Sequence, residues 1–301
     1  MPVTILSHPA CNRHNVGSDH PENPARLHAI SDQILSSGLE FVIHQRDAKA
    51  ADVEQIALAH DRAYIQSVIS KSPSTGQVWL DDDTAIMNKS LEAAMYAAGA
   101  GIMAVDLVMQ GHDQQVFCAI RPPGHHAESA QAMGFCVFNN IAIAAKYALA
   151  QYGLRRVAII DFDVHHGNGT EQIFRTDDRV MFCSSFEHPF YPYTDPIGTP
   201  LCLKMPLAAG SQGAAFRQAF TSEWLPALRA FQPELILVSA GFDAHQEDEM
   251  AHLKWTEHDY AWIASELKQL AQEYCAGRIV ACLEGGYAHS ALGRSVVAML
   301  K

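Results

Sequence analysis

The chain has 301 residues, of which 49% are hydrophobic, 18% charged and 9% aromatic. This composition supplies a packed core and argues against intrinsic disorder, and the length fits one large domain or two small ones. The formal net charge of −12 disfavours nucleic acid and acidic membrane surfaces as partners, whereas it suits cationic partners such as lysine-rich segments or polyamines.

The cysteines and the N-terminus indicate the compartment. Seven cysteines are scattered along the chain without a Cys-x-x-Cys pair, which is typical of reduced thiols in an intracellular protein. The first residues lack a basic start and a long apolar run, so we expect no signal peptide. The longest uncharged apolar stretch, 93–105, is too short to cross a bilayer. We therefore expect a cytoplasmic protein.

Helical and strand-like patterns alternate along the chain. The strand-like runs are apolar on both alternating faces and end in Gly or polar residues, as in strands that helices cover on both sides. One helical pattern begins at a plausible N-cap, Thr256. In chain order we expect a helix over 90–110, a strand over 115–121, a helix over 140–153, strands over 156–163 and 180–185, a helix over 214–231, a strand over 234–243, a helix over 256–275 and a strand over 278–286.

This alternation predicts an α/β fold. No linker, repeat or low-complexity segment divides the chain, so we expect a single domain over 1–301. Two long segments without periodicity, 72–88 and 185–200, carry aromatics, prolines and acids. Long aromatic loops of this kind favour binding surfaces.

Reactive side chains follow four of the expected strands. The carboxyl ends of neighbouring strands in such a sheet open onto one crevice, where ligands bind. Four separate motifs therefore converge on one place. In chain order they contribute His125 and His126, then Asp161, Asp163, His165, His166 and Asn168, then Asp243, and finally Tyr287.

Three of these residues form a candidate metal site. In an extended segment Asp161, Asp163 and His165 point to the same side, and Asp243 arrives from another strand. Asp163, His165 and Asp243 give three ligands with an open position, the pattern of a catalytic divalent metal, most often Zn²⁺. Two carboxylates make the site hard enough for Fe²⁺ or Co²⁺ as well. Helix caps or arginine pairs explain a lone Asp better than they explain this set.

The remaining groups fit acid–base work. Asp161 lies two residues before Asp163 on the same side of the extended segment, close enough to orient a histidine. The His125–His126 pair follows Arg-Pro-Pro-Gly, a rigid backbone that holds side chains in place.

Five ordered motifs, RPPGHHA, GFCVFNN, DFDVHHGNGT, SAGFDAH and LEGGY, resemble the zinc-dependent histone deacetylase superfamily over nearly the whole chain. That superfamily includes acetylpolyamine amidohydrolases and bacterial deacetylase-like proteins. The segment HPENPARL (20–27) and Asn168, which stands in place of an aspartate, look like the class II branch. The resemblance implies an arginase-like, three-layer α/β/α fold with a mostly parallel central sheet.

The resemblance also implies ion ligands. By match, Asp163, His165 and Asp243 resemble the zinc ligands. The family holds monovalent cations, usually K⁺, near these carboxylates. Asp161, Asp163, His165 and Ser184 would line the inner K⁺ site, partly through backbone carbonyls.

Catalytic roles follow in the same way. His125 and His126 resemble the tandem acid–base histidines, with Asp161 behind the first and Asn168 beside the second. Tyr287 matches the tyrosine that hydrogen-bonds the substrate carbonyl. The implied reaction is metal-assisted amide hydrolysis, in which His126 takes a proton from water. Because Asn168 is neutral, it stabilises imidazolium less than a carboxylate would, which favours His126 as a base.

The substrate would enter through an acyl-lysine tunnel. Gly134 and Gly285 match its lining, and Phe135 matches one aromatic wall. The opposite wall should come from the second long loop, where Phe190 and Tyr191 are both candidates because the loop departs from the family pattern.

Two other functions use related residues. An arginase-type ureohydrolase would need a second metal site with further aspartates, but His166 follows His165, and the residue two positions after Asp243 is His245 and not an aspartate. A catalytically silent metal-containing binding module would lack Tyr287 or one of the two histidines, and none is missing.

The substrate stays open between acetyl-lysine in proteins or peptides, which we favour, acetylpolyamines and small acetylated metabolites. Acids in 79–86 and 245–250 could line an entrance for a polyamine. Family members of the polyamine type are often dimers, so a homo-oligomer is conceivable.

Overall fold

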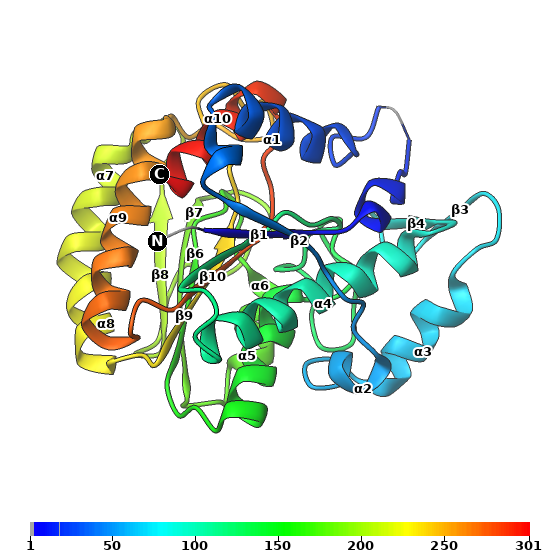
Figure 1. Ribbon diagram of the computed structural model, residues 1–301, viewed down its shortest axis with the longest axis horizontal. Coiled ribbons are helices and arrows are strands. Elements are labelled where there is room, and N and C mark those ends of the chain that lie inside the picture. The colour runs from blue at the N-terminus through cyan, green and yellow to red at the C-terminus, as the bar shows by residue number, and fades with distance from the viewer. Residues whose placement is uncertain (1–2, 18) are drawn as a thin grey trace.

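The structure is a computed structural model that describes residues 3–17 and 19–301. Within this part of the chain, eight strands form one parallel sheet in the order β2-β1-β5-β10-β9-β6-β7-β8 (Figure 1). Their bounds are β1 Thr4–Ser7, β2 His44–Asp47, β5 Gln115–Cys118, β6 Val157–Asp161, β7 Val180–Glu187, β8 Cys202–Leu207, β9 Leu235–Ala240 and β10 Ile279–Leu283.

Helices cover the sheet on both faces and make it the middle of three layers (Figure 1). One outer layer packs α1, α10, α9 and α7 against one another and against β8 and β9, and the other packs α4 and α5 against β1, β5, β6, β9 and β10. This arrangement confirms the predicted three-layer α/β fold. The helices are α1 Ala25–Ser36, α2 Val53–Ile56, α3 Arg62–Lys71, α4 Ser90–Met109, α5 Asn140–Tyr152, α6 Asn168–Phe174, α7 Gly213–Ala219, α8 Leu225–Phe231, α9 Glu257–Tyr274 and α10 His289–Leu300.

The core follows from the apolar patterns of the central strands. Every residue of β6, β7, β9 and β10 is buried, because helices lie against both faces of these strands. All seven cysteines are free thiols and six of them are buried. The predicted N-cap of α9 is confirmed, since the backbone N–H of Thr256 donates to Asp259 at 2.8 Å in a capping box.

Helix α4 is the one helix in the described part of the chain that is long and apolar enough to cross a membrane by length and composition. Helix α4 is longer than the uncharged stretch 93–105, because the helix also includes Glu92 and Asp106, the charged residues on either side of that stretch. In the fold, 67% of its most apolar window is buried. Its small residues permit close packing: a Cβ on Gly99 would lie only 1.9 Å from the carbonyl oxygen of Lys49.

Several elements differ from the prediction. The helix expected over 214–231 is interrupted by a π-helical turn, Phe220–Trp224, between α7 and α8. The loop expected over 72–88 contains a two-stranded hairpin, β3 Gln77–Trp79 and β4 Ala85–Met87. Strands β1, β2 and β8 were not predicted. β2 is polar and fully exposed, while β8 contains Lys and Pro, so neither shows the pattern of a buried strand.

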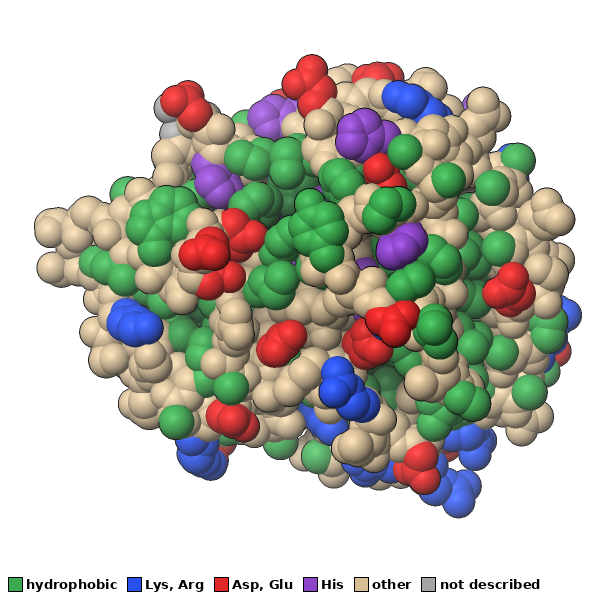
Figure 2. Space-filling view, turned by 180° about the vertical axis from the view of Figure 1, so that it is seen from behind, with side chains coloured by type: hydrophobic (Ala, Val, Ile, Leu, Met, Phe, Trp, Pro, Cys, Tyr) green, Lys and Arg blue, Asp and Glu red, His purple; other side chains and the backbone are tan. Residues whose placement is uncertain are grey.

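The sheet order brings the reactive segments together. Strands β5, β10, β9, β6 and β7 are consecutive neighbours, and their carboxyl ends meet at the same edge of the sheet. Four of the predicted strands extend beyond β5, β6, β9 and β10 at this edge, because the chain there is buried but irregular. The fifth, predicted over 180–185, is shorter than β7, which continues to Glu187. On the face drawn in Figure 2, apolar side chains and Asp, Glu and His share the centre, while most Lys and Arg lie toward the lower edge.

Candidate active site

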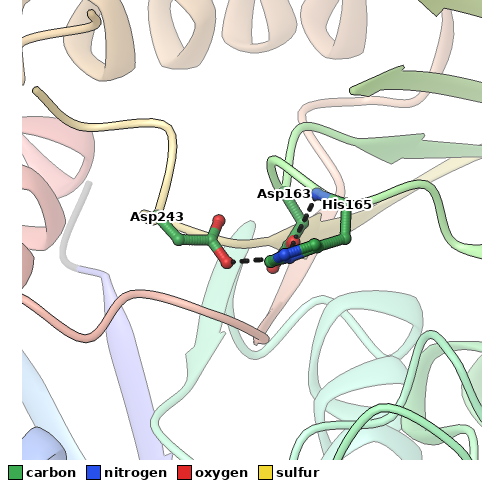
Figure 3. A group of neighbouring side chains, drawn as sticks. All are labelled: Asp163, His165 and Asp243. Atoms are coloured by element: carbon green, nitrogen blue, oxygen red, sulfur yellow. Dashed lines mark hydrogen bonds and ion pairs between the residues drawn. The ribbon is translucent and has the colours of Figure 1, made fainter. Parts of the chain in front are cut away.

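Asp163, His165 and Asp243 converge at this edge of the sheet (Figure 3). Asp163 and His165 follow β6, and Asp243 follows the neighbouring strand β9. All three are buried, and one ligand atom from each lies within 4.8 Å of the others. The Nδ1 atom of His165 is 3.1 Å from Asp163 Oδ1 and 3.3 Å from Asp243 Oδ2. The structure thus brings together the three ligands proposed from the sequence.

The donor set fits a divalent metal. Asp243 Oδ2 is buried and has no partner in hydrogen-bond geometry, although His165 Nδ1 lies 3.3 Å away, whereas Oδ1 accepts the N–H of Val164 at 2.9 Å. Burial, together with the nearby Asp163 carboxylate, raises the pKa of Asp243 to about 6. Two buried carboxylates and an unsatisfied oxygen call for a bound cation. Two oxygens and one imidazole nitrogen suit Zn²⁺, Fe²⁺ or Co²⁺.

Among the described residues, Asp163, His165 and Asp243 are the one cluster of side chains placed to hold a metal ion. The Nδ1 atom of His166 lies 2.9 Å from Ser184 Oγ, and its Nε2 lies 2.7 Å from Glu171 Oε2. His166 therefore supports the chain beneath the site and adds no ligand to a second metal, as a two-metal ureohydrolase would require.

The tandem histidines lie beside the metal ligands, each with its own partner. His125 Nδ1 donates to Asp161 Oδ2 at 2.9 Å, and His126 Nδ1 lies 2.7 Å from Asn168 Oδ1. Both histidines are buried and their ring centroids are 4.0 Å apart. The two pairings expected from the sequence are therefore present.

The partners give the two histidines different charges. Burial by itself would lower the pKa of His125, but the carboxylates of Asp161 and Asp163 outweigh it and raise that pKa to about 10. Burial lowers the pKa of His126 well below its usual value, and the positive charge of the neighbouring His125 lowers it further. At neutral pH the pair thus consists of one imidazolium and one neutral imidazole, a division of labour that suits acid–base catalysis.

The tautomer of His126 is set by Asn168. The Nδ2 of Asn168 donates to Glu128 Oε1 at 3.2 Å, so its Oδ1 faces His126. An amide oxygen only accepts, which places the ring proton of His126 on Nδ1. Nε2 then keeps a lone pair for accepting a proton.

A cavity of about 210 Å³ opens onto these groups. Apolar side chains dominate its walls, and Phe190 and Tyr191 both line it, so the two candidates for the second wall are both present. Phe190 stacks on His165 with ring centroids 5.6 Å apart, and Tyr191 meets the same ring edge-on at 5.9 Å. The other lining residues are Asp83, Pro123, His125, His126, Gly134, Phe135, Met250, Gly285 and Tyr287.

Two lining glycines admit no side chain. A Cβ on Gly134 would lie 2.2 Å from His126 Cδ2, and one on Gly285 would lie 2.0 Å from Asp243 Oδ2. The next residue, Phe135, adopts a left-handed backbone with φ of 67°, which is unfavourable by roughly 1–3 kcal/mol for a residue with a side chain.

Tyr287 is held at the cavity wall by contacts that the sequence analysis did not predict. Its N–H donates to Asp248 Oδ2 at 2.6 Å, and the Arg26 guanidinium lies 4.9 Å from its ring centroid. Arg26 also donates to the carbonyl oxygens of Glu284 and Gly286. Burial raises the pKa of Tyr287 well above its usual value, so its hydroxyl stays protonated. Arg26 lies within the segment HPENPARL, which the sequence analysis used only to compare the chain with the class II branch and not to predict a contact with Tyr287.

Glu284 is a second residue that the sequence analysis missed. This fully buried carboxylate accepts the N–H groups of Gly124 at 2.6 Å and His125 at 3.1 Å, and the hydroxyl of Ser239 at 3.1 Å. Glu284 thereby ties the end of β10 to the histidine loop. Glu284 could have been found from the sequence, because it directly follows an apolar run at the start of the motif LEGGY, where a carboxylate is expected to be buried.

Comparison with known proteins agrees with this geometry. A family model described as the histone deacetylase domain matches residues 20–301. Histone deacetylase 14 of Arabidopsis thaliana, a chloroplastic protein, is 39% identical over 97% of this chain and 74% of its own length. The human polyamine deacetylase HDAC10 is 36% identical over 91% of this chain and 43% of its own length. The crystal structure of the HDA15 HD domain superimposes with a TM-score of 0.93 at 31% identity, covering 100% of this chain and 87% of that one.

Proposed function

Since the chain belongs to the histone deacetylase family and carries its Asp-His-Asp metal site, we propose that this hydrolase removes acetyl groups from Nε-acetyl-lysine in proteins or peptides. The observation that carries the proposal is the apolar cavity that ends at the metal ligands and the tandem histidines. An acetyl-lysine side chain combines a four-carbon apolar stem with a terminal amide, and this shape and polarity suit such a cavity.

The proposed reaction assigns a task to each group. Asp163, His165 and Asp243 would hold the divalent ion, and we propose Zn²⁺. When bound, such an ion acidifies water and polarises the acetyl carbonyl. His126, neutral and with a free Nε2, accepts the proton of the attacking water. Tyr287, whose hydroxyl stays protonated, donates to the carbonyl oxygen as negative charge develops there.

His125 and Asp161 support this proton transfer. Asp161 holds the N–H of His125 and keeps the ring in its charged form. A neighbouring imidazolium keeps His126 neutral until it accepts the proton, and the histidine pair then supplies a proton to the leaving amine. The apolar walls limit bulk water around the reacting atoms.

The charges at the cavity favour acetyl-lysine over acetylpolyamine. Asp83 is the only carboxylate among the described residues that line the cavity, and both of its oxygens accept hydrogen bonds from protein groups. Acids that could attract a polyamine are exposed or engaged elsewhere: Asp82 is exposed, and Glu247 pairs with Arg294. Met250, an uncharged residue, occupies the cavity wall. Among the described residues that line the cavity, the ammonium of a polyamine would therefore find no carboxylate that is free of protein hydrogen bonds.

The test compares kcat/KM for an acetyl-lysine peptide with kcat/KM for N-acetylputrescine. We expect the peptide to be the better substrate, and Met250→Glu, which adds a carboxylate to the wall, to move the ratio toward N-acetylputrescine. Tyr287→Phe serves as the inactive control. A wild-type preference for N-acetylputrescine would instead assign the protein to the polyamine class, which the similarity to HDAC10 makes the second candidate.

We propose in addition that K⁺ binds beneath the divalent ion, near Asp161, Asp163, His165 and Ser184. In support, Asp161 at the end of β6 is in register with Ser184 in β7, and both are buried. Replacing K⁺ by a large organic cation at constant ionic strength should lower activity, and unchanged activity would contradict this site. The cytoplasmic location and the homo-oligomer stay predictions.

A further inference from the structure

Tyr287 lies on a short segment between the end of β10 and the start of α10. Gly285 and Gly286 precede it, and the φ of Gly286 is 117°, a value that residues with a side chain rarely adopt. Arg26 holds the start of this segment, since its Nε donates to the carbonyl oxygen of Gly286 at 2.7 Å. Because glycine leaves the backbone many conformations, the place of the Tyr287 ring depends on groups that hold the segment from outside.

Asp248 holds the same segment after the glycines. Its Oδ2 atom accepts the N–H of Tyr287 at 2.6 Å and the N–H of Ala288 at 3.0 Å. These two residues directly precede α10, and the free N–H groups at the start of a helix stabilise a negative charge. Asp248 is buried, and hydrogen bonds to a carboxylate are roughly twice as strong as those between neutral groups. Asp248 therefore fixes the backbone of Tyr287 itself.

The second oxygen of Asp248 holds a wall of the cavity. Oδ1 accepts the N–H of Met250 at 3.0 Å, and Met250 lines the cavity. The N–H of Asp248 donates to the carbonyl oxygen of His245 at 2.9 Å, in the turn that follows the metal ligand Asp243. One buried residue thus connects the chain after a metal ligand, a wall of the cavity and the tyrosine.

These contacts give Asp248 an indirect role. Three N–H groups occupy its carboxylate, and Asp248 is not among the described residues that line the cavity, whereas Tyr287 is. A donor to a developing oxyanion works at about 2.7–3.1 Å from that oxygen, and a misplacement of about 1 Å can cost roughly 10²-fold in rate. A group that fixes the tyrosine therefore controls the rate without touching the substrate.

We propose that Asp248 is a positioning residue for catalysis, which holds the Tyr287 hydroxyl where it donates to the substrate carbonyl and links that hydroxyl to the Met250 wall. The proposal rests on the deacetylase function proposed above. The contact that shapes the substrate wall and the contact that places the proton donor share one carboxylate. A change at Asp248 should therefore affect substrate binding and turnover through different oxygens.

A double-mutant cycle in kcat tests the link to Tyr287. Asp248→Ala should lower kcat for an acetyl-lysine peptide by roughly 10–100-fold in the wild-type background, no more than the loss expected for Tyr287→Phe. In the Tyr287→Phe background the same substitution should lower kcat by less than about threefold, because the hydroxyl that Asp248 places is already gone. An equal loss in both backgrounds would show that Asp248 supports the metal ligands or the fold in general, and would overturn the proposal.

The Michaelis constant reports the second contact. Asp248→Ala should raise KM by a similar factor in both backgrounds, since the Met250 contact does not involve the tyrosine hydroxyl, and an unchanged KM would contradict the link to that wall. Asp32→Ala makes the same change at an exposed site on α1 and is the matched control, with kcat and KM close to the wild-type values.

Asp248→Asn keeps the test decisive should Asp248→Ala fail to fold. Its uncharged oxygen holds the N–H groups of Tyr287 and Ala288 more weakly, so kcat should fall by about three- to tenfold where the tyrosine is intact and stay unchanged in the Tyr287→Phe background. The same loss in both backgrounds would again contradict the positioning role.

Amide hydrogen exchange tests the contacts without turnover. The N–H groups of Tyr287 and Ala288 should exchange faster in Asp248→Ala, while those of Gly124 and His125, which a different carboxylate holds, should keep their wild-type rates. Unchanged exchange at Tyr287 would overturn the proposal. A wild-type protein that hydrolyses N-acetylputrescine and not the peptide would contradict the proposed substrate, and the cycle run with N-acetylputrescine would then decide the role of Asp248 in the same way.

Discussion

Replacing Asn168 by aspartate would place a carboxylate against the catalytic base. The amide oxygen of Asn168 now lies 2.7 Å from His126 Nδ1, and burial keeps the pKa of His126 well below its usual value. A carboxylate within about 4–6 Å stabilises the charged form of its partner and moves a pKa by roughly 1–3 units. In Asn168→Asp the pKa of His126 should therefore rise by about that amount.

The sign of the kinetic effect follows from the role of His126. A base works in its neutral form, which is lost as the pH falls through its pKa. The acidic limb of kcat/KM against pH should thus move to higher pH by roughly 1–3 units in Asn168→Asp. Gln172→Glu adds a carboxylate on the same helix at a side chain whose hydrogen bonds go to Ser129, so it is the matched control and should leave the limb close to the wild-type position. An active Asn168→Asp enzyme with an unshifted limb would refute the assignment of His126 as the base.

Three further predictions follow. Tyr287→Phe should lower kcat by about 10²–10³ with little change in KM, since it removes one donor to the developing oxyanion; unimpaired turnover would contradict that role. Gly285→Ala should weaken metal affinity in a chelator competition, because its Cβ would lie 2.0 Å from Asp243 Oδ2; unchanged affinity would argue against this crowding. Burial raises the pKa of Glu284 from 4.5 to about 7, so the folded protein holds a proton that the unfolded chain releases, and stability falls between these pH values. Glu284→Gln should remove that decline, gaining up to about 3 kcal/mol on the wild type in urea unfolding between pH 4.5 and 7, and a pH-independent difference would disprove it.

The sequence predicted those parts of the fold that carry a local signal. Strands such as 156–163 are apolar on both faces because helices cover both sides, and this pattern is visible without the structure. The polar edge strand β2 and the short hairpin β3–β4 lack it, since their backbone pairing is set by neighbours and not by their own burial. The π-helical turn after α7 likewise has no distinct local pattern.

The candidate site divides in the same way. Asp163, His165 and Asp243 could be grouped because parallel strands deliver their ends to one edge. The roles of Asp248 and Glu284 could not be predicted, since each accepts hydrogen bonds from backbone N–H groups at least 39 residues away. Such contacts depend on how loops pack, and a carboxylate in a loop shows no pattern that separates a buried anchor from a solvated charge.

Metal content measured together with activity tests the central claim most directly. The purified protein should bind one divalent ion per chain at Asp163, His165 and Asp243 and should lose hydrolysis of an acetyl-lysine peptide when a chelator removes the ion. Activity should return with Zn²⁺, Fe²⁺ or Co²⁺ in the wild type and stay absent in Asp243→Ala. A metal-free preparation with full activity would contradict the account.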